Sequence, residues 1–373
     1  MDHLHFYVED LASWQDWFQD IWRFRPRGIR RHPTSQTVWL SHGSIQLLLS
    51  QPTHNLGEVA DYLSHHPPGL ADIALRLRAL PANLSPLAGH GWSASLEVVT
   101  QTETGIHWRV RIPALSHPQV SHSLLCYGGE DALALLGFEP LDRSRGEQVD
   151  RMASQRYPSF AQIDHVVLNV DFGEMTRLAA WYQSLLGWDP LYHYRIATDH
   201  SGLESVVVGD LRGFSPIQLA INQPLGSTSQ IQEFLDIHHG AGIQHVALAT
   251  SHIVRTIHHL RAGGVPFLEV PPSYYQNLSQ RLKDHPDFTD WQAAQLLIDE
   301  QTDPPIDQPC PLPNQSVHPE GLIIQTFTQP LFSQPTFFFE IIERRGMVSG
   351  FGENNFQALF EAMERQQRQR DPA

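Results

Sequence analysis

Three side chains that bind metal ions well lie in separate, mostly apolar stretches of the chain: His165, His245 and Glu340. Each stretch is rich in β-branched or aromatic residues, which is typical of a buried strand. A buried polar group without a partner costs free energy, and one shared metal ion would partner all three. Two imidazoles and one carboxylate are the ligand set of non-haem iron(II) oxygenases, which leave coordination positions open for an organic substrate and dioxygen. The three residues therefore predict an iron(II) oxygenase site, although the same ligands also accept manganese or cobalt.

The other histidines give no comparable signal. The chain contains 22 His, so a histidine in an apolar strand can also be an ordinary core residue. The pairs at 65–66, 238–239 and 258–259 lie in polar or helical surroundings. We interpret these pairs as solvated surface residues.

The composition indicates a two-domain protein. A chain of 373 residues is too long for one ordinary core and suits two domains of the usual size. Lys and Arg number 25 against 40 Asp and Glu, a formal net charge of −15, which disfavours nucleic acid and anionic membranes as partners. The two cysteines, Cys126 and Cys310, show no paired spacing, so neither a disulfide framework nor a thiolate metal site is expected.

The expected location follows from the same overview, and the assembly is a separate expectation. No segment has the unbroken apolar length of a membrane span, and the first residues enter a strand pattern at once, so we expect no signal peptide. We expect a cytoplasmic protein that forms a homodimer or homotetramer.

An internal repeat organises the chain. Residues 2–8 parallel residues 164–170, and residues 69–75 parallel residues 242–248. Each of these strand patterns leads into an amphipathic stretch and then into further strands. We predict four copies of a strand-helix-strands unit, two in each half, that belong to the α+β class and curl their sheets around a shared concavity.

The two halves differ in their candidate ligands. We predict an N-terminal domain at 1–150 and a catalytic domain at 160–373. Opposite the three candidate ligands, the first half has His3, Asp72 and, in a weaker alignment, Ser123. A lone His and Asp make a poor iron site, so the first domain is expected to serve a structural or oligomerisation role.

Two segments lie outside this scheme. Residues 303–320 are polar and rich in Pro, which predicts an exposed excursion between strands. Asn354 and Asn355 are expected to cap a C-terminal helix that follows a glycine hinge at 350–352. This helix could be a lid or an ordinary packing helix. Its apolar positions at helical spacing are Phe356, Leu359, Phe360 and Met363.

Three segments of the second half are distinctive together: Gly240–Leu248, Pro271–Leu278 and Phe339–Arg344, the last followed by Gly350–Phe356. In this order they resemble the 4-hydroxyphenylpyruvate dioxygenase family. The resemblance covers nearly the whole chain in organisation and is most specific over 160–368. It implies the vicinal-oxygen-chelate fold, in which tandem βαβββ modules form two open-barrel domains, here with a C-terminal lid helix.

The resemblance also implies roles for individual residues. The iron(II) ligands would be His165, His245 and Glu340. Residues in catalytic positions would be Gln244, Asn355 and Phe356. Residues that bind the substrate would be Ser205, Asn222, Gln230, Gln325, Phe327, Phe338 and Phe351. Amides and hydroxyls suit a phenol and an α-keto acid, and phenyl faces suit an aromatic ring; ordinary core packing is the alternative for Phe338 and Phe351.

The implied reaction converts 4-hydroxyphenylpyruvate and dioxygen to homogentisate and CO2, in tyrosine catabolism or in tocopherol and quinone synthesis. A rival is 4-hydroxymandelate synthase, which uses the same substrate but hydroxylates the benzylic carbon. Phe356 argues against the rival, because the synthases tend to have a smaller aliphatic residue there. More distant alternatives are extradiol ring cleavage and a non-enzymatic module that binds small aromatic molecules.

The chain departs from the family pattern at a few positions. Ala220 stands where the family has Pro, Gln223 where it has Glu, and Asn354 where it commonly has Gly. The excursion over 303–320 is also longer than usual. These departures bear on substrate fit and lid motion rather than on the iron ligands, and Ala220 keeps the synthase alternative open.

Overall fold

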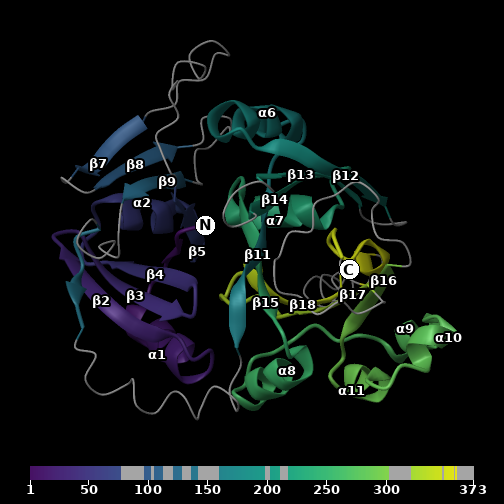
Figure 1. Cartoon of the computed structure of the whole chain (residues 1–373). Helices are drawn as coiled ribbons and strands as arrows, with labels where there is room; N and C mark the ends of the chain where they lie inside the picture. The colour runs from purple at the N-terminus through teal and green to yellow at the C-terminus, as the bar shows by residue number, and fades with distance from the viewer. Residues whose placement is uncertain are drawn as a thin grey trace.

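The protein is described by a computed structural model (Figure 1). The structure describes residues 1–76, 96–101, 105–111, 121–127, 136–141, 159–197, 202–210, 217–301, 321–346, 348–356 and 358. The predicted excursion over 303–320 lies outside the described residues.

Within the described residues, the first half of the chain builds one ten-stranded sheet. Its strands are β1 (Leu4–Tyr7), β2 (Arg25–His32), β3 (Ser35–His42), β4 (Ile45–Pro52), β5 (Gly69–Ile73), β6 (Leu75–Arg76), β7 (Leu96–Gln101), β8 (Gly105–Arg111), β9 (Ser121–Tyr127) and β10 (Glu139–Pro140). Its helices are α1 (Leu11–Asp20) and α2 (Glu58–His65). The strand order is β10-β2-β3-β4-β1-β5-β9-β8-β7, with β6 paired to β9.

The second half builds an eight-stranded sheet in the order β12-β13-β14-β11-β15-β18-β17-β16, counted over the same described part of the chain. The strands are β11 (Phe160–Asn169), β12 (Asp189–Ala197), β13 (Gly202–Asp210), β14 (Ile217–Pro224), β15 (Gly242–Thr250), β16 (Leu297–Gln301), β17 (Gly321–Phe327) and β18 (Phe338–Arg345). The helices are α6 (Met175–Leu186), α7 (Gln230–His238), α8 (Ile253–Ala262), α9 (Pro272–Asn277), α10 (Gln280–Lys283), α11 (Phe288–Ala293) and the 3-10 helix η1 (Glu353–Asn355).

The predicted repeat is confirmed by the strand pairing. In the second half, β11 is parallel to β14, β15 is parallel to β18, and β11 and β15 are antiparallel neighbours at the centre. The first half repeats this arrangement with β1 and β4, β5 and β9, and the central pair β1 and β5. In Figure 1 the edge strands β12 and β16 come round to the same side, so the second sheet is a curled half-barrel. The fold is therefore the expected α+β arrangement of tandem βαβββ modules.

Strand β18 contributes side chains both to the hydrophobic core and to the concave side of the second sheet. Its successive side chains point to opposite faces, so Phe338 and Glu340 line a cavity while Phe339 packs from the opposite face into the main hydrophobic core. That core contains residues of both halves. The Phe339 ring centroid lies 4.9 Å from that of Trp22, which follows α1 in the first half. The first half therefore packs directly behind the strand that carries the candidate carboxylate ligand.

Two histidine interpretations are wrong. His66 and His238 are each only 4% exposed, and their rings stack with centroids 4.9 Å apart. The His66 Nδ1 atom donates to the carbonyl oxygen of His238 at 2.6 Å. Burial lowers the pKa of His238 to about 3. These two residues connect the end of α2 to the end of α7, a contact between the halves that local polarity does not reveal.

The expected start of the C-terminal helix needs a correction. Asn354 and Asn355 lie within η1, whose N-cap is Gly352, and the Asn354 amide donates to Asp299 Oδ1 at 2.6 Å rather than capping a helix. Phe356 and Ala358 are helical; the rest of the proposed lid helix lies outside the described residues. No helix in the described part of the chain combines the length and apolarity needed to cross a membrane.

The domain boundaries and roles stay predictions. The described strands of the first sheet lie between residues 4 and 140, and those of the second between residues 160 and 345. This division of the strands does not test the structural or oligomerisation role of residues 1–150 or the catalytic role of residues 160–373.

Packing across the two halves can be tested at Phe339. Phe339→Ala removes a ring that is 1% exposed, and we expect it to lower the free energy of unfolding by about 3–5 kcal/mol. Phe172→Ala is the matched control, because Phe172 is 75% exposed and its loss should change stability by no more than about 0.5 kcal/mol. Denaturant unfolding monitored by circular dichroism gives both values. Equal stabilities for the two variants would show that the contact between the halves adds little.

Candidate metal centre and cavity

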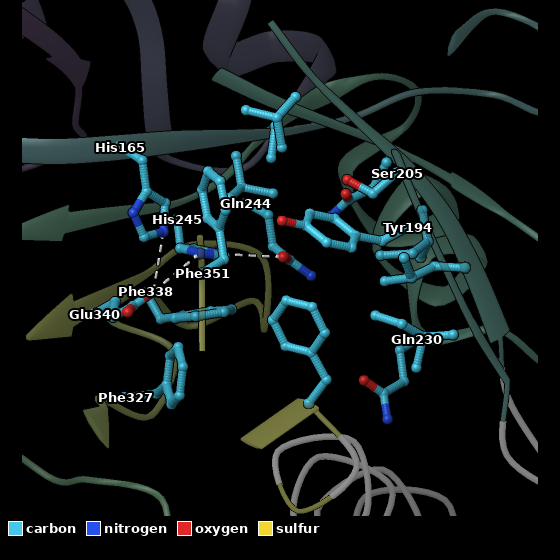
Figure 2. A pocket seen from close by; sticks show the side chains of 18 of the residues that line it. His165, Tyr194, Ser205, Gln230, Gln244, His245, Phe327, Phe338, Glu340 and Phe351 are labelled. Atoms are coloured by element: carbon cyan, nitrogen blue, oxygen red, sulfur yellow. Dashed lines mark hydrogen bonds and ion pairs between the residues drawn. The ribbon is translucent and has the colours of Figure 1, made fainter. Parts of the chain in front are cut away.

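The three predicted ligands meet on neighbouring central strands. His165 comes from β11, His245 from β15 and Glu340 from β18. Their candidate ligand atoms all lie within 4.8 Å of one another, and all three residues are buried. The Glu340 Oε2 atom lies 3.1 Å from His165 Nε2 and 3.5 Å from His245 Nε2. Figure 2 shows the three side chains converging at one end of a cavity.

Strand register explains this convergence. Ala247 of β15 pairs with His165 on one side and with Glu340 on the other. His245 lies two residues before Ala247, so its side chain emerges on the same face of the sheet. Three neighbouring strands therefore bring their ligands together through pairing, and the register of β11 with β15 shifts on either side of His165, at Asp164 in β11 and at Gln244 in β15.

The carboxylate suits a cation. The Glu340 Oε1 atom is buried and has no hydrogen-bond partner among the described residues, and such a charged oxygen is costly without one. Burial opposes ionisation of Glu340, but the two imidazoles outweigh it and hold the pKa of the carboxyl below its usual value. The buried donor set of two nitrogens and one carboxylate therefore fits a divalent transition metal ion.

The two imidazoles differ electrostatically. Burial disfavours the charged form of both, and it lowers the pKa of His245. For His165 the carboxylates of Glu340 and Asp164 outweigh burial and raise the pKa to about 9. In the metal-free protein a proton on His165 thus balances part of the carboxylate charge, and a metal ion would replace that proton.

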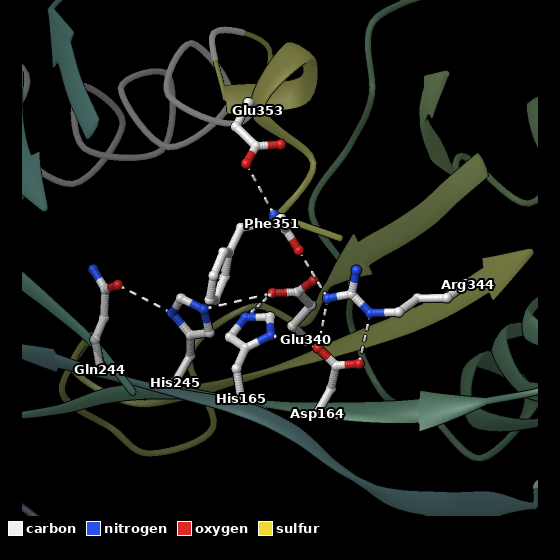
Figure 3. A network of polar contacts seen from close by, with 9 residues as sticks. Asp164, His165, Gln244, His245, Glu340, Arg344, Phe351 and Glu353 are labelled. Atoms are coloured by element: carbon white, nitrogen blue, oxygen red, sulfur yellow. Dashed lines mark hydrogen bonds and ion pairs between the residues drawn. The ribbon is translucent and has the colours of Figure 1, made fainter. Parts of the chain in front are cut away.

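Each imidazole is oriented by a partner behind it (Figure 3). His165 Nδ1 donates to Asp164 Oδ1 at 2.9 Å, and His245 Nδ1 donates to Gln244 Oε1 at 3.1 Å. Both bonds turn Nε2 toward the centre of the site, where it faces the carboxylate of Glu340. Such second partners fix the ring orientation and raise the basicity of the ligand nitrogen.

A buried ion pair supports Asp164. The guanidinium of Arg344 donates through Nε to Asp164 Oδ2 at 2.8 Å and through Nη2 to Oδ1 at 2.7 Å. Burial opposes ionisation of Asp164, but Arg344 outweighs it and holds the pKa of that carboxyl well below its usual range. Arg344 Nη2 also donates to the carbonyl oxygen of Gly350 at 2.9 Å. The ion pair thus links a metal ligand to the segment that precedes η1.

The cavity beside the three ligands has an empty volume of about 670 Å³, part of which is open to solvent. Its lining, which is mostly apolar with a few polar groups, suits a small organic molecule. Apart from the ligands, the predicted site residues in its lining are Ser205, Asn222, Gln230, Gln244, Gln325, Phe327, Phe338, Phe351 and Phe356. The structure therefore brings these predicted residues together in one cavity, while their roles stay predictions.

Two phenyl rings cover the imidazoles. The Phe338 ring stacks on that of His245 with centroids 4.8 Å apart and an interplanar angle of 18°. The Phe351 ring meets His165 edge to face at 4.5 Å and 68°. Both rings line the cavity, so they are part of its wall in addition to their packing role.

Asn355 lies outside the cavity lining. It is 1% exposed, and its Oδ1 accepts a hydrogen bond from the Tyr274 hydroxyl at 2.8 Å. Tyr274 in turn accepts from the backbone N–H of Ile298 at 2.7 Å. These bonds fasten η1 to α9 and to the edge of the sheet. The catalytic role predicted for Asn355 stays a prediction, and in this structure the residue contacts its neighbours rather than the cavity.

Several lining residues were missed in the sequence. They are Val167, Tyr194, Ile196, Leu203, Val207 and Ile231; Ala220 also lines the cavity and was expected to bear on substrate fit. Strand alternation could have identified most of them, because Leu203 and Val207 lie two residues on either side of Ser205 on the same face. Tyr194 is the Cα partner of Ser205 in the pairing of β12 with β13, which sequence alone does not reveal.

The residues at the corresponding positions of the first half form hydrogen bonds with other side chains or backbone groups of that half. Asp72 Oδ1 accepts from the backbone N–H of Ser123 at 2.8 Å, and Asp72 Oδ2 accepts from the Ser123 hydroxyl at 2.5 Å. His3 Nδ1 donates to Asp2 Oδ1 at 2.7 Å. In the described part of the first half, no three metal-binding groups cluster as they do in the second.

The fold and centre define a class of protein. Residues 162–290 match the family model of the Glyoxalase/Bleomycin resistance protein/Dioxygenase superfamily. Among solved structures, a triple mutant of 4-hydroxymandelate synthase from Streptomyces coelicolor has a TM-score of 0.75 at 20% identity and covers 98% of both chains. At that identity the likeness shows the fold alone. The protein is a member of the vicinal-oxygen-chelate class.

Full-length comparisons give the family within this class. The chain is 34% identical to an uncharacterized protein of Synechocystis sp., covering 99% of this chain and 98% of the relative. It is 30% identical to the 4-hydroxyphenylpyruvate dioxygenase of Yarrowia lipolytica, covering 99% of this chain and 92% of the relative. The chain therefore belongs to the 4-hydroxyphenylpyruvate dioxygenase family, and it is an enzyme of the dioxygenase type.

The role of Arg344 in supporting the candidate metal centre can be tested by substituting it and, separately, its neighbour Arg345. Arg344→Gln removes the charge beside Asp164, and we expect metal affinity to fall about tenfold to a hundredfold. Arg345→Gln is the matched control, because Arg345 pairs with Asp287 and Glu343. Competition with a chromophoric chelator measures the affinity of each variant. Equal affinities would contradict a role of the Asp164–Arg344 pair in holding His165.

Proposed function

We propose that this protein is an iron(II)-dependent 4-hydroxyphenylpyruvate dioxygenase, which converts 4-hydroxyphenylpyruvate and dioxygen to homogentisate and CO2. One observation carries the proposal: a buried centre of two histidines and one glutamate lies at the end of a cavity lined by phenyl rings and amides. Membership of the family supports the choice of substrate, which is the one in the names of characterised relatives.

His165, His245 and Glu340 would hold the iron. Iron(II), when bound, supplies the electron chemistry with dioxygen that amino-acid side chains lack. The protein would hold the substrate's keto acid beside this centre and its ring farther along the cavity. Gln244 is already fixed through its Oε1 by His245, which leaves its amide N–H groups as donors to the keto acid.

The other end of the cavity suits the phenol hydroxyl. Ser205 and Asn222 are Cα partners on β13 and β14, and both line the cavity. Asn222 Nδ2 lies 3.4 Å from Asn169 Oδ1, which leaves the Asn222 Oδ1 atom available to accept the phenol proton. Gln230 and Gln325 add further amide groups to the wall. The aromatic ring would lie between Phe338, Phe351 and Phe356, and the phenyl groups would exclude water from it.

Benzylic hydroxylation of the same substrate is the competing reaction. Ala220 lines the cavity and replaces the proline that the family pattern has at this place, which changes the wall beside Asn222. Phe356 also lines the cavity, and its ring contacts that of Tyr194 with centroids 5.8 Å apart. Because the Phe356 ring occupies this position, we expect the substrate ring to bind in the orientation that leads to homogentisate. The identity of the product decides between the two reactions.

We also propose that the enzyme works in the cytoplasm as a homodimer or homotetramer, in tyrosine catabolism or in tocopherol and quinone synthesis. The domain at 1–150 would stabilise the catalytic domain or join subunits. Light scattering of the full chain measures the number of subunits. A monomer at micromolar concentration would contradict the assembly.

The reaction is tested by dioxygen uptake with the iron(II)-loaded protein and 4-hydroxyphenylpyruvate. We expect homogentisate and CO2 in equal amounts, and we expect His245→Ala to lose its iron and essentially all uptake, because two protein ligands hold the metal weakly. His258→Ala is the control, since His258 is an exposed residue of α8 and should leave uptake unchanged. Formation of 4-hydroxymandelate would give the assignment to the competing reaction, and no uptake with iron bound would refute the substrate.

A further inference from the structure

The segment before η1 folds around the carboxylate of Glu353. Gly350 and Gly352 both have positive φ, +83° and +78°. A Cβ atom at Gly350 would lie 2.4 Å from Glu353 Oε1, and one at Gly352 would lie 2.3 Å from the Gln325 Oε1 atom. Only glycine fits such close approaches in this conformation. The glycines therefore allow the chain to close tightly over Glu353 and Gln325.

The Glu353 carboxylate receives two donors. Its Oε1 accepts from the Tyr194 hydroxyl at 2.5 Å and from the backbone N–H of Phe351 at 3.3 Å. Tyr194 belongs to β12 and lines the cavity. Burial and the bond to Glu353 raise the pKa of Tyr194 far above its usual value, so the phenol stays protonated and remains a donor. Hydrogen bonds to a charged acceptor are the stronger kind.

Two connections thus hold the same short segment. On one side, Arg344 donates to the carbonyl oxygen of Gly350 and to Asp164, which orients His165. On the other side, the Tyr194 hydroxyl reaches the N–H of Phe351 through the carboxylate of Glu353. Between them lies the Phe351 ring, which contacts His165 (Figure 3). Both connections therefore end at the same candidate metal ligand.

We propose that Tyr194 is a positioning residue: through Glu353 it fixes the segment 350–353 and so seats the Phe351 ring between His165 and the substrate. The hydroxyl acts through Glu353 and does not touch the reacting atoms, whereas the Tyr194 ring forms part of the aromatic wall, with its centroid 6.4 Å from that of Phe351. The part of this proposal that concerns the substrate rests on the proposed function.

Four variants separate positioning from ordinary packing. Tyr194→Phe keeps the ring and removes only the hydroxyl. Glu353→Ala removes the acceptor, and the double variant combines both changes. Tyr192→Phe is the matched control, because Tyr192 lies on the same strand, packs on the same Phe351 ring at 6.3 Å, and has no place in the cavity lining.

The first measurement is hydrogen exchange of the peptide 348–356 in the substrate-free protein. We expect exchange to be faster on the order of tenfold in Tyr194→Phe and in Glu353→Ala. The double variant should exchange no faster than Glu353→Ala, because the two groups act as one pair, and Tyr192→Phe should match the natural protein. Natural exchange in Tyr194→Phe, or effects that multiply in the double variant, would overturn the proposal.

The second measurement is steady-state kinetics with 4-hydroxyphenylpyruvate. We expect KM to rise on the order of tenfold in Tyr194→Phe, with a smaller change in kcat, because a seated Phe351 ring acts on substrate binding. A lower kcat at unchanged KM would contradict this assignment. If the natural protein does not turn over this substrate, the proposed function fails, whereas the exchange measurement still decides the role of Tyr194.

Discussion

The buried carboxylate of Glu340 is the constraint on which the rest of the structure depends. It lies between two imidazoles, and one of its oxygens has no partner among the described residues. A charge in such a place is stable only beside compensating charge. The pairing of β11, β15 and β18 supplies the two imidazoles at this point, and the curl of the sheet leaves the cavity in front of them. The second half thus places a buried charge at a point where a metal ion would compensate it.

Two kinds of support keep the ligands in place. The polar support runs from His165 through Asp164 to Arg344, and the apolar support consists of rings that cover both imidazoles. Low polarity around the site strengthens the polar contacts, so the phenyl rings and the ion pair reinforce each other. The same phenyl rings bound the cavity. The features that hold the candidate metal ligands in place are therefore also the ones that shape the cavity.

Much of this arrangement could be predicted from the sequence, and the reasons are local. The ligands lie in strand patterns that repeat along the chain, so their residue types and the modular fold are visible without coordinates. The pairing of Asp164 with Arg344 joins residues far apart in sequence, and Tyr194 reaches the cavity only through strand register. His66 and His238 were misread for a similar reason, because their burial arises from a contact between halves. Local pattern reveals strands and ligands but not contacts that depend on how the sheets curl and pack.

The two halves satisfy a buried carboxylate in different ways. In the first half, the carboxylate of Asp72 has both oxygens bonded to Ser123, so it needs no metal ion. In the second half, Glu340 retains an oxygen that has no partner among the residues that the structure describes. The two carboxylates lie on different strands, because Asp72 of β5 corresponds to His245 and Glu340 of β18 corresponds to Ser123. In each half the fold must satisfy the buried carboxylate from within or from a ligand. The first half keeps a physical role nonetheless, because its aromatic core packs behind Phe339 on the strand that carries Glu340.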